Sequence, residues 1–317
     1  MMQKMGKVQI VKSEYWDDKG EIPFSLVACN RTNTLSIKRS NVYYLITVNV
    51  RGNNKAIKIE ADVDAEFEKF YELVMDIIRF ENLFDGRFFR ISSWEFDGNN
   101  MLPQLDNKLL GYMNSRISMS CFYIKYDDTT YRSLFNRFEK YLNKKLLQYH
   151  ISLYSTYLDG MPVDLRLAQL IEIFEPLACE LYEKGEIRLR ANPYLVVKEK
   201  CPKCGCSVAK KIRNKGTHLE DLIKAVIKRY GKDIFDGDSV AKVVRKAVVL
   251  RNKIDHVSNQ RGSMTGPECG FYLYKFQLLY RIIVMQEIGI PYESIEGRVK
   301  ILINDFNKKF ANQRLLP

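Results

Sequence analysis

The spacing of apolar residues divides the chain into a β-rich half and a helical half. Between residues 8 and 62, short apolar or alternating runs are separated by Asn-Asn, Arg-Gly and Asp-Lys-Gly turns, which predicts strands. The expected strands are VQIV, SLVAC, TLSIK, VYYLITVNV and KAIKIEA. Residues 64–84 have apolar positions three and four apart, so we expect a helix there with Asp64 as its N-cap. Two more strand patterns follow, RFFRISSWEF and SRISMSCFYIKY, and residues 131–148 return to helical spacing.

After His150 the pattern becomes helical. Apolar residues at helical spacing predict helices over 163–184, 218–230, 239–257 and 269–288, and an amphipathic segment over 292–310. Pro176 is expected to kink or break the first of these helices.

These patterns predict an α+β protein with two domains. Residues 1–150 would form a β-rich domain with helices, whose role the sequence does not indicate. Residues 151–317 would form an all-α four-helix bundle, with a basic, turn-rich insert over 185–217 that contains cysteines.

The charge of the chain changes the expected partners. The net charge is +12, and residues 201–263 hold fifteen Lys or Arg against six Asp or Glu. Such a basic field attracts polyanions, which favours nucleic acid as a partner; a solvated face that only aids solubility is the alternative. No apolar run approaches the roughly 18 residues of a membrane span, and the first residues contain no apolar signal core. We therefore expect a soluble, cytoplasmic protein that does not enter a membrane.

Polar residues gather at the C-terminal end of the predicted helix 239–257. Asn252 and His256 are four residues apart and share one helix face, and Arg251 precedes Asn252. A histidine can act as acid or base near neutral pH, an arginine fork matches phosphate oxygens, and an asparagine can orient the histidine. The three are candidate catalytic residues. The alternative is an Arg–His pair that only complements the helix dipole.

The segment Leu250–His256 (LRNKIDH) resembles the Arg-Asn-x-x-x-His motif of the HEPN superfamily. It lies on the third of four predicted helices and is followed by a polar loop, SNQRGS, and a long last helix. Over roughly 163–290 the chain is most similar to the ApeA-like HEPN proteins of bacterial anti-phage defence. The resemblance also implies a polar residue on the first bundle helix near the site. Glu175 is a candidate for it, with a plain surface glutamate as the alternative.

This resemblance implies a metal-independent endoribonuclease of the HEPN type, in which the RNA 2′-hydroxyl attacks the adjacent phosphorus. No cofactor would serve catalysis, and two copies of the motif would meet in a homodimer. The implied role is anti-phage defence by abortive infection, or that of a toxin, with a phage-derived protein as trigger. The alternative is a non-catalytic HEPN-like dimer that binds RNA or a nucleotide, or acts as a scaffold.

A cysteine cluster in the insert predicts a structural Zn²⁺ site. Cys201 and Cys204 form a Cys-x-x-Cys turn whose two sulfurs can reach one tetrahedral ion, and Cys206 adds a third thiolate. His218 and Cys269 are the candidates for a fourth ligand. A redox pair and three free thiols are the alternatives. The remaining cysteines, expected to be reduced core residues, are Cys29, Cys121 and Cys179.

Overall fold

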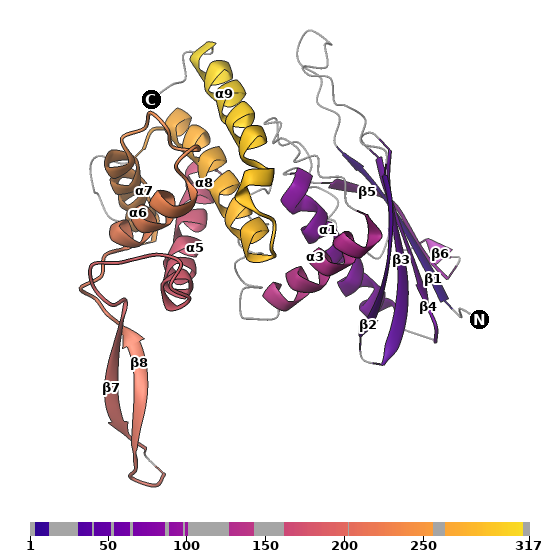
Figure 1. Cartoon of the computed structure of the whole chain (residues 1–317), viewed down its shortest axis with the longest axis horizontal. Helices are drawn as coiled ribbons and strands as arrows, with labels where there is room; N and C mark the ends of the chain where they lie inside the picture. Colours follow the sequence, from indigo (N-terminus) through magenta and orange to yellow (C-terminus); the bar gives the residue numbers. More distant parts are fainter. Residues whose placement is uncertain are drawn as a thin grey trace. The chain divides into compact units, whose positions relative to one another are not determined.

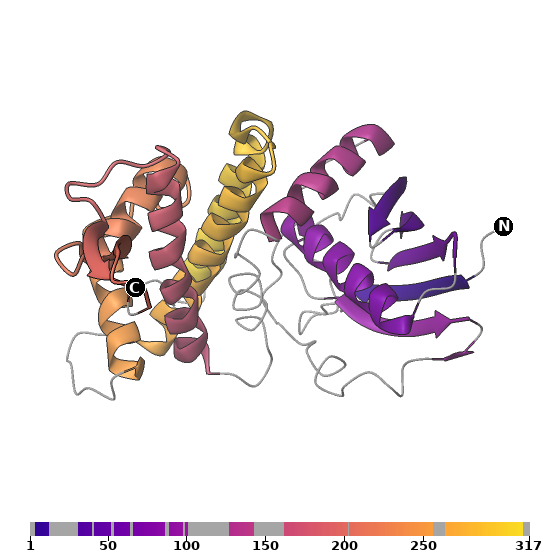
Figure 2. The same cartoon turned by 90° about the horizontal axis from the view of Figure 1, so that it is seen from below.

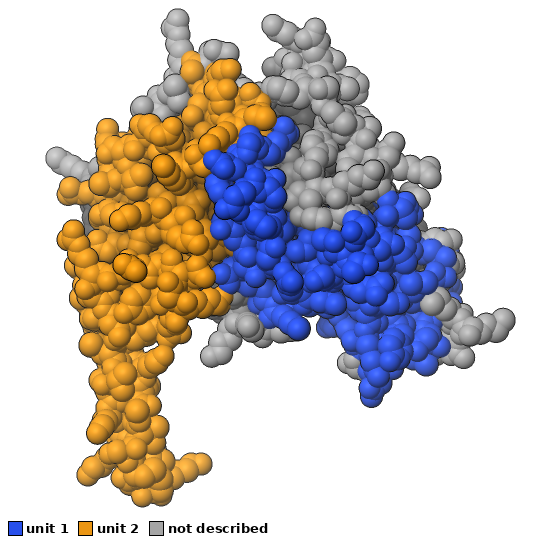
Figure 3. All heavy atoms as spheres, viewed as in Figure 1, with its two compact units in different colours: residues 1–161, 284–298 blue, residues 162–283, 299–317 orange. Residues whose placement is uncertain are grey.

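The structure, a computed structural model, describes most of the chain in two compact units. The described residues are 4–12, 31–39, 41–51, 54–63, 66–85, 89–97, 99–100, 127–142, 162–201, 203–255 and 264–312. One unit comprises residues 1–161 with 284–298, and the other 162–283 with 299–317 (Figure 3). The expected α+β fold class is confirmed. The domain boundary expected at residue 150, and the expected strands SLVAC and SRISMSCFYIKY, lie outside the described residues.

The first unit contains an antiparallel six-stranded sheet of order β2-β3-β4-β1-β5-β6. Its strands are β1 (Lys4–Lys12), β2 (Arg31–Arg39), β3 (Val42–Arg51), β4 (Asn54–Ala61), β5 (Phe89–Phe96) and β6 (Asn99–Asn100). Over residues 33–38, 42–49 and 56–61 of β2, β3 and β4, buried side chains alternate with more exposed ones, which is typical of a sheet covered on one face. Helices α1 (Phe67–Asp85) and α3 (Asp128–Tyr141) lie on the same side of this sheet (Figure 1).

Aromatic and ionic contacts hold the two helices to the sheet. The rings of Tyr44 on β3 and Phe70 on α1 meet edge to face, with centroids 5.6 Å apart. Arg39 at the end of β2 bonds both Asp76 of α1 and Glu139 of α3. This unit is therefore a two-layer α/β sandwich with one apolar core between its layers.

The second unit is a helical bundle. It contains α5 (Val163–Glu183), α6 (Leu219–Tyr230), α7 (Val240–Asp255) and most of α8 (Gly266–Glu287) and α9 (Glu296–Asn312). The end of α8, the 3₁₀ turn η3 (Tyr292–Ser294) and the start of α9 belong to the first unit. Figure 2 shows these helices from a second side. All side chains from 271 to 285 on α8 are buried, as expected for a helix that is apolar on nearly every side. Pro176 was expected to interrupt α5, but the helix continues through it to Glu183.

The insert between α5 and α6 folds into a β-hairpin that the sequence did not predict. Strands β7 (Tyr194–Lys200) and β8 (Ser207–Arg213) pair antiparallel and project from the helices as a narrow two-stranded ribbon (Figure 1). Nearly every side chain of both strands is exposed or half-exposed. The ribbon therefore has no core of its own. Among the described helices, none is long and apolar enough to cross a membrane.

Candidate functional site

Helix α7 carries the candidate catalytic motif at its C-terminal end. Val243, Ala247 and Leu250 are buried, at the spacing of three and four residues that predicted this face. The buried face contacts α5 and α6. Packing along the helix therefore fixes the position of its last turn, which holds Arg251 and Asn252.

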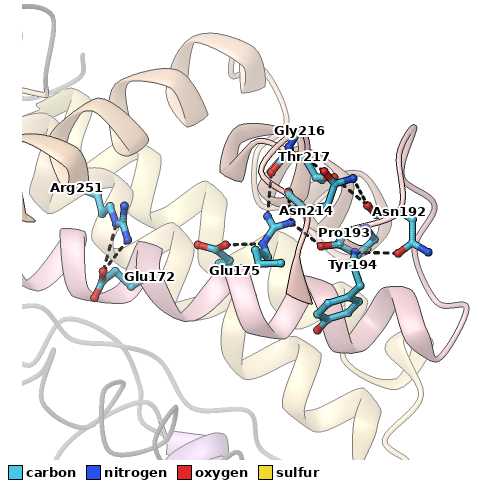
Figure 4. Close-up of polar contacts among 10 residues, drawn as sticks. Glu172, Glu175, Asn192, Pro193, Tyr194, Asn214, Gly216, Thr217 and Arg251 are labelled. Carbon is cyan, nitrogen blue, oxygen red and sulfur yellow. Dashed lines mark hydrogen bonds and ion pairs between the residues drawn. The ribbon is translucent and has the colours of Figure 1, made fainter. Parts of the chain in front are cut away.

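Arg251 is bonded to an acidic side chain of α5. Its Nε and Nη2 atoms donate to the same carboxylate oxygen of Glu172, at 3.2 and 2.9 Å, and its Nη1 donates to Oδ1 of Asn252 at 3.1 Å. Figure 4 shows the pair bridging from α7 to α5. The Arg251 side chain is 23% exposed and that of Glu172 is 47% exposed, so the pair lies at the surface of the bundle. The guanidinium is thus oriented by a partner and still reachable from solvent.

The third motif residue, His256, lies outside the described residues. In the structure the side chains of Arg251 and Asn252 are in contact, and His256 follows Asn252 by four residues in the sequence. Its catalytic role remains a prediction from the sequence. Further basic side chains on α7 are exposed, namely Lys242, Arg245 and Lys253. They supply positive charge along the helix that ends at the motif, which suits a polyanionic ligand.

Glu175, three residues beyond Glu172 on α5, has a different partner. Nε of Arg213, at the end of β8, donates to its carboxylate at 2.8 Å. The same guanidinium donates to the backbone oxygens of Pro193 (2.9 Å), Asn214 (3.0 Å) and Thr217 (2.9 Å). Glu175 therefore anchors the base of the hairpin, and the acidic residue that contacts the motif is Glu172.

Tyr194, the first residue of β7, adds a second anchor at the base of the hairpin. Burial, together with the neighbouring Cys179 of α5, raises the pKa of Tyr194 to about 12. Cys179 is itself buried and free, as expected for a reduced core cysteine. The hairpin is thus fixed to α5 at its base through both of its strands.

The three clustered cysteines meet at the far end of the hairpin. The Sγ atoms of Cys201, Cys204 and Cys206 all lie within 4.8 Å of one another. Cys201 is half-buried, and the other two are exposed. Two backbone bonds close the turn: Cys201 N–H donates to the oxygen of Cys206 (2.8 Å), and Gly205 N–H donates to the oxygen of Cys201 (2.9 Å). Gly205 has φ of +70°, a conformation that favours glycine, so the sequence CPKCGC suits this tight turn.

Neither expected fourth ligand belongs to this cluster. Cys269 is fully buried near the start of α8, where its thiol lies 3.9 Å from the Met264 oxygen. His218 is exposed and immediately precedes α6. The seven residues of β8 separate the cysteine turn from this end of the chain, a span of roughly 20 Å for an extended strand. Among the described residues, the cluster is therefore a three-sulfur site.

The helical unit also matches a known family. Residues 165–294 match the family model described as Apea-like HEPN. This part of the chain is therefore similar to Apea-like HEPN domains. No curated protein and no solved structure matches the chain. The matched region begins in α5, includes the hairpin and α7, and ends at η3, so the hairpin lies inside the matched region.

The match to HEPN domains indicates a functional class at the level of the family. HEPN domains are typically ribonucleases, and they often bind RNA and act as dimers, which supports a nuclease or defence role at the level of the family. Sequence reasoning missed Glu172 and Arg213. The signal that could have found Glu172 was its position one helical turn before Glu175, on the helix expected to contribute a polar residue.

Proposed function

We propose that this protein is an endoribonuclease of the HEPN type that cleaves RNA without a metal ion. One observation carries the proposal: within a region similar to Apea-like HEPN domains, the motif arginine Arg251 lies at a helix end, bonded to Glu172 and Asn252 and reachable from solvent. A partly exposed, oriented guanidinium suits a phosphodiester, because its planar fork matches two phosphate oxygens.

The proposed reaction needs only the RNA and side chains. His256 takes the proton from a ribose 2′-hydroxyl, and the 2′-oxygen attacks the adjacent phosphorus. Arg251 stabilises the negative charge that builds up on the phosphate oxygens. The bond to the 5′-oxygen breaks, and that oxygen takes a proton from a histidine acting as acid. The products are a 2′,3′-cyclic phosphate and a 5′-hydroxyl.

The proposed working form is a homodimer in which two motifs face one RNA strand. Such an arrangement supplies a base and an acid from different chains, and a two-fold dimer is the commonest symmetry of a homo-oligomer. The proposed biological role is anti-phage defence or toxicity, switched on by a phage-derived protein. Light scattering should show a dimer at micromolar concentration; full activity from a species that is only monomeric would contradict this part of the proposal.

The decisive experiment compares variants on mixed RNAs in the presence of EDTA. The wild-type chain should cleave and leave 2′,3′-cyclic ends, and His256→Ala and Arg251→Ala should lose cleavage by at least ~100-fold. Arg132→Ala, which changes an exposed arginine of α3 outside the basic face of α7, is the matched control and should retain cleavage. A strict need for magnesium, or undiminished activity in both variants, would overturn the mechanism. RNA binding without cleavage by the wild type would support instead a non-catalytic HEPN-like binding or scaffolding dimer.

A further inference from the structure

The side chains of the β7–β8 hairpin pack too little to stabilise it. A two-stranded ribbon without a packed face is marginal in water. Apolar residues of the strands are exposed rather than packed: Leu195 is 46% exposed, Val196 66% and Val208 49%. Arg213 and Tyr194 fix the base of the ribbon, whereas the other end lies seven strand residues away.

The cysteine turn lies at that other end, where a cross-link would stabilise the ribbon most directly. It joins the last residue of β7 to the first residue of β8, and the strands are paired up to this point, with Lys200 opposite Ser207. The Sγ atoms of Cys204 and Cys206 are 2.7 Å apart, and Cys201 is in reach of both. Three sulfurs gathered this closely around one point form the kind of site that a soft divalent cation occupies.

We propose that the tip of the hairpin binds one Zn²⁺ ion through the thiolates of Cys201, Cys204 and Cys206. The three thiols release their protons to solvent as the metal binds. Zn²⁺ prefers four ligands in a tetrahedron, and within the described part of the chain no fourth His, Cys, Asp or Glu joins the cluster. The fourth place goes to water or to a group from outside the described residues.

This metal acts on the order of the hairpin and takes no part in the proposed cleavage. Arg251 lies on α7, whereas the cysteines lie at the end of a ribbon that is attached to α5 at its base. Because a site of this kind forms only in the folded turn, metal binding contributes directly to the folding of the turn. Removing the metal should therefore loosen the ribbon and leave the helices intact. The zinc proposal and the proposed nuclease activity can therefore be tested independently, and failure of one does not contradict the other.

Metal analysis of the full chain tests the site. Protein prepared without chelators should hold about one zinc per chain, as a single site implies. Cys201→Ser, Cys204→Ser and Cys206→Ser should each lose most of it, and Ser207→Ala, next to the cluster, and His218→Ala should retain it. In Co²⁺-substituted protein, the sulfur-to-metal absorption of wild type should weaken in each cysteine variant. No zinc in the wild type, full retention in a cysteine variant, or a Cys204–Cys206 disulfide in its place would overturn the proposal.

A second measurement separates loss of metal from general unfolding. Trypsin can cut the ribbon at exposed lysines such as Lys200, Lys203 and Lys210. Chelation of wild type, and each cysteine substitution, should speed these cuts at least about tenfold, whereas the helical circular dichroism and its melting temperature should stay unchanged. Equal cutting rates with and without metal would overturn the stabilising role.

Discussion

Two arginines pair with glutamates that lie three residues apart on α5: Arg213 pairs with Glu175, and Arg251 pairs with Glu172 (the latter pair is labelled in Figure 4). At the base of the hairpin, Arg213 pairs with Glu175 and also donates to three backbone oxygens. Backbone oxygens move only if the chain moves. Arg213 therefore joins α5 to the residue before β7 and to the segment after β8.

At the end of α7, Arg251 donates to the side chains of Glu172 and Asn252. Side chains can rotate while the helices stay in place, so the proposed role of Arg251 requires only that it exchange these side-chain partners for a phosphate. The exposed fractions of the two arginines are close, 23% for Arg251 and 30% for Arg213. Similar exposure therefore does not tell the two arginines apart, whereas the three backbone bonds of Arg213 assign it a structural role.

The largest expected effect separates the two arginines by activity. Arg251→Lys should lower RNA cleavage by at least ~100-fold, because an ammonium cannot replace a planar fork that holds a phosphate in the transition state. Arg213→Lys should change it less than about threefold, since Arg213 contacts no group proposed to react. Initial rates on a labelled RNA measure both. Equal losses of cleavage in the two variants would contradict the proposed difference between Arg251 and Arg213.

The next effect separates them by stability. Arg213→Leu should lower the free energy of unfolding by about 2 kcal/mol, because it leaves a carboxylate and backbone oxygens without their donor. Arg251→Leu should lower it by less than about 1 kcal/mol, as is usual for an ion pair near the surface. Urea denaturation followed by circular dichroism gives both values. If Arg251→Leu lowered the free energy of unfolding more than Arg213→Leu does, Arg251 would have the structural role instead.

A smaller effect is expected from the partner of Arg251. Glu172→Gln should lower kcat about tenfold, because an amide orients the guanidinium more weakly than a carboxylate does. KM for RNA should not rise, since the substitution also removes a negative charge beside the proposed phosphate site. Glu183→Gln on the same helix, which breaks an exposed pair with Lys211, is the matched control and should change neither constant. An unchanged kcat in Glu172→Gln would show that Glu172 does not position Arg251.

The smallest effect concerns a third ion pair, which gives a reference for an ordinary structural contact. Lys246 of α7 donates to Glu268 of α8 at 2.5 Å, and Thr265 N–H donates to the same carboxylate at 2.8 Å. Burial alone would raise the pKa of Glu268, but these bonds outweigh it and leave the pKa below 4.5, its ordinary value.

Glu268 is therefore more acidic in the folded chain than in the unfolded chain. Its contribution to stability is fully present above about pH 4.5 and is lost as the pH falls through the lowered pKa of the folded state. At pH 7, Glu268→Gln should be less stable than wild type by about 1 kcal/mol. That difference should shrink below pH 4.5, as urea denaturation at a series of pH values can measure. A difference that is independent of pH would contradict the assignment.

Much of the fold was predictable because packing leaves a regular trace in the sequence. The buried positions Val243, Ala247 and Leu250 recur at helical spacing, and the alternation in TLSIK and VYYLITVNV marks one covered face of a sheet. The hairpin was missed for the same reason. Its strands are exposed on both faces, so YLVVKEK and SVAKKIR carry no alternation between buried and solvent positions.

The site was predictable only in part. The spaced motif singled out Arg251 and Asn252, whereas Glu172 had only the weaker signal of its position one helical turn before Glu175. Its role depends on which helix packs beside α7, and this information lies in the tertiary structure. For Pro176 the sequence-based prediction was wrong, because it expected an interruption of α5 where the helix is continuous. A proline removes one hydrogen bond from a helix, and the packed residues on both sides of it, Phe174 and Leu177, keep α5 continuous.

The attachment of the hairpin has a consequence for how this domain can diverge. Its contacts with the helices are concentrated at its base, where Tyr194 and Arg213 meet α5, and its strands bury almost nothing. Segments of this kind tolerate insertion and replacement, because a change in them disturbs no packed neighbour. We therefore expect that the ribbon between these two anchor residues can be lengthened, shortened or replaced without changes to the packed residues of the bundle. The hairpin is thus a segment whose length and sequence can change without disturbing the packing of the helices.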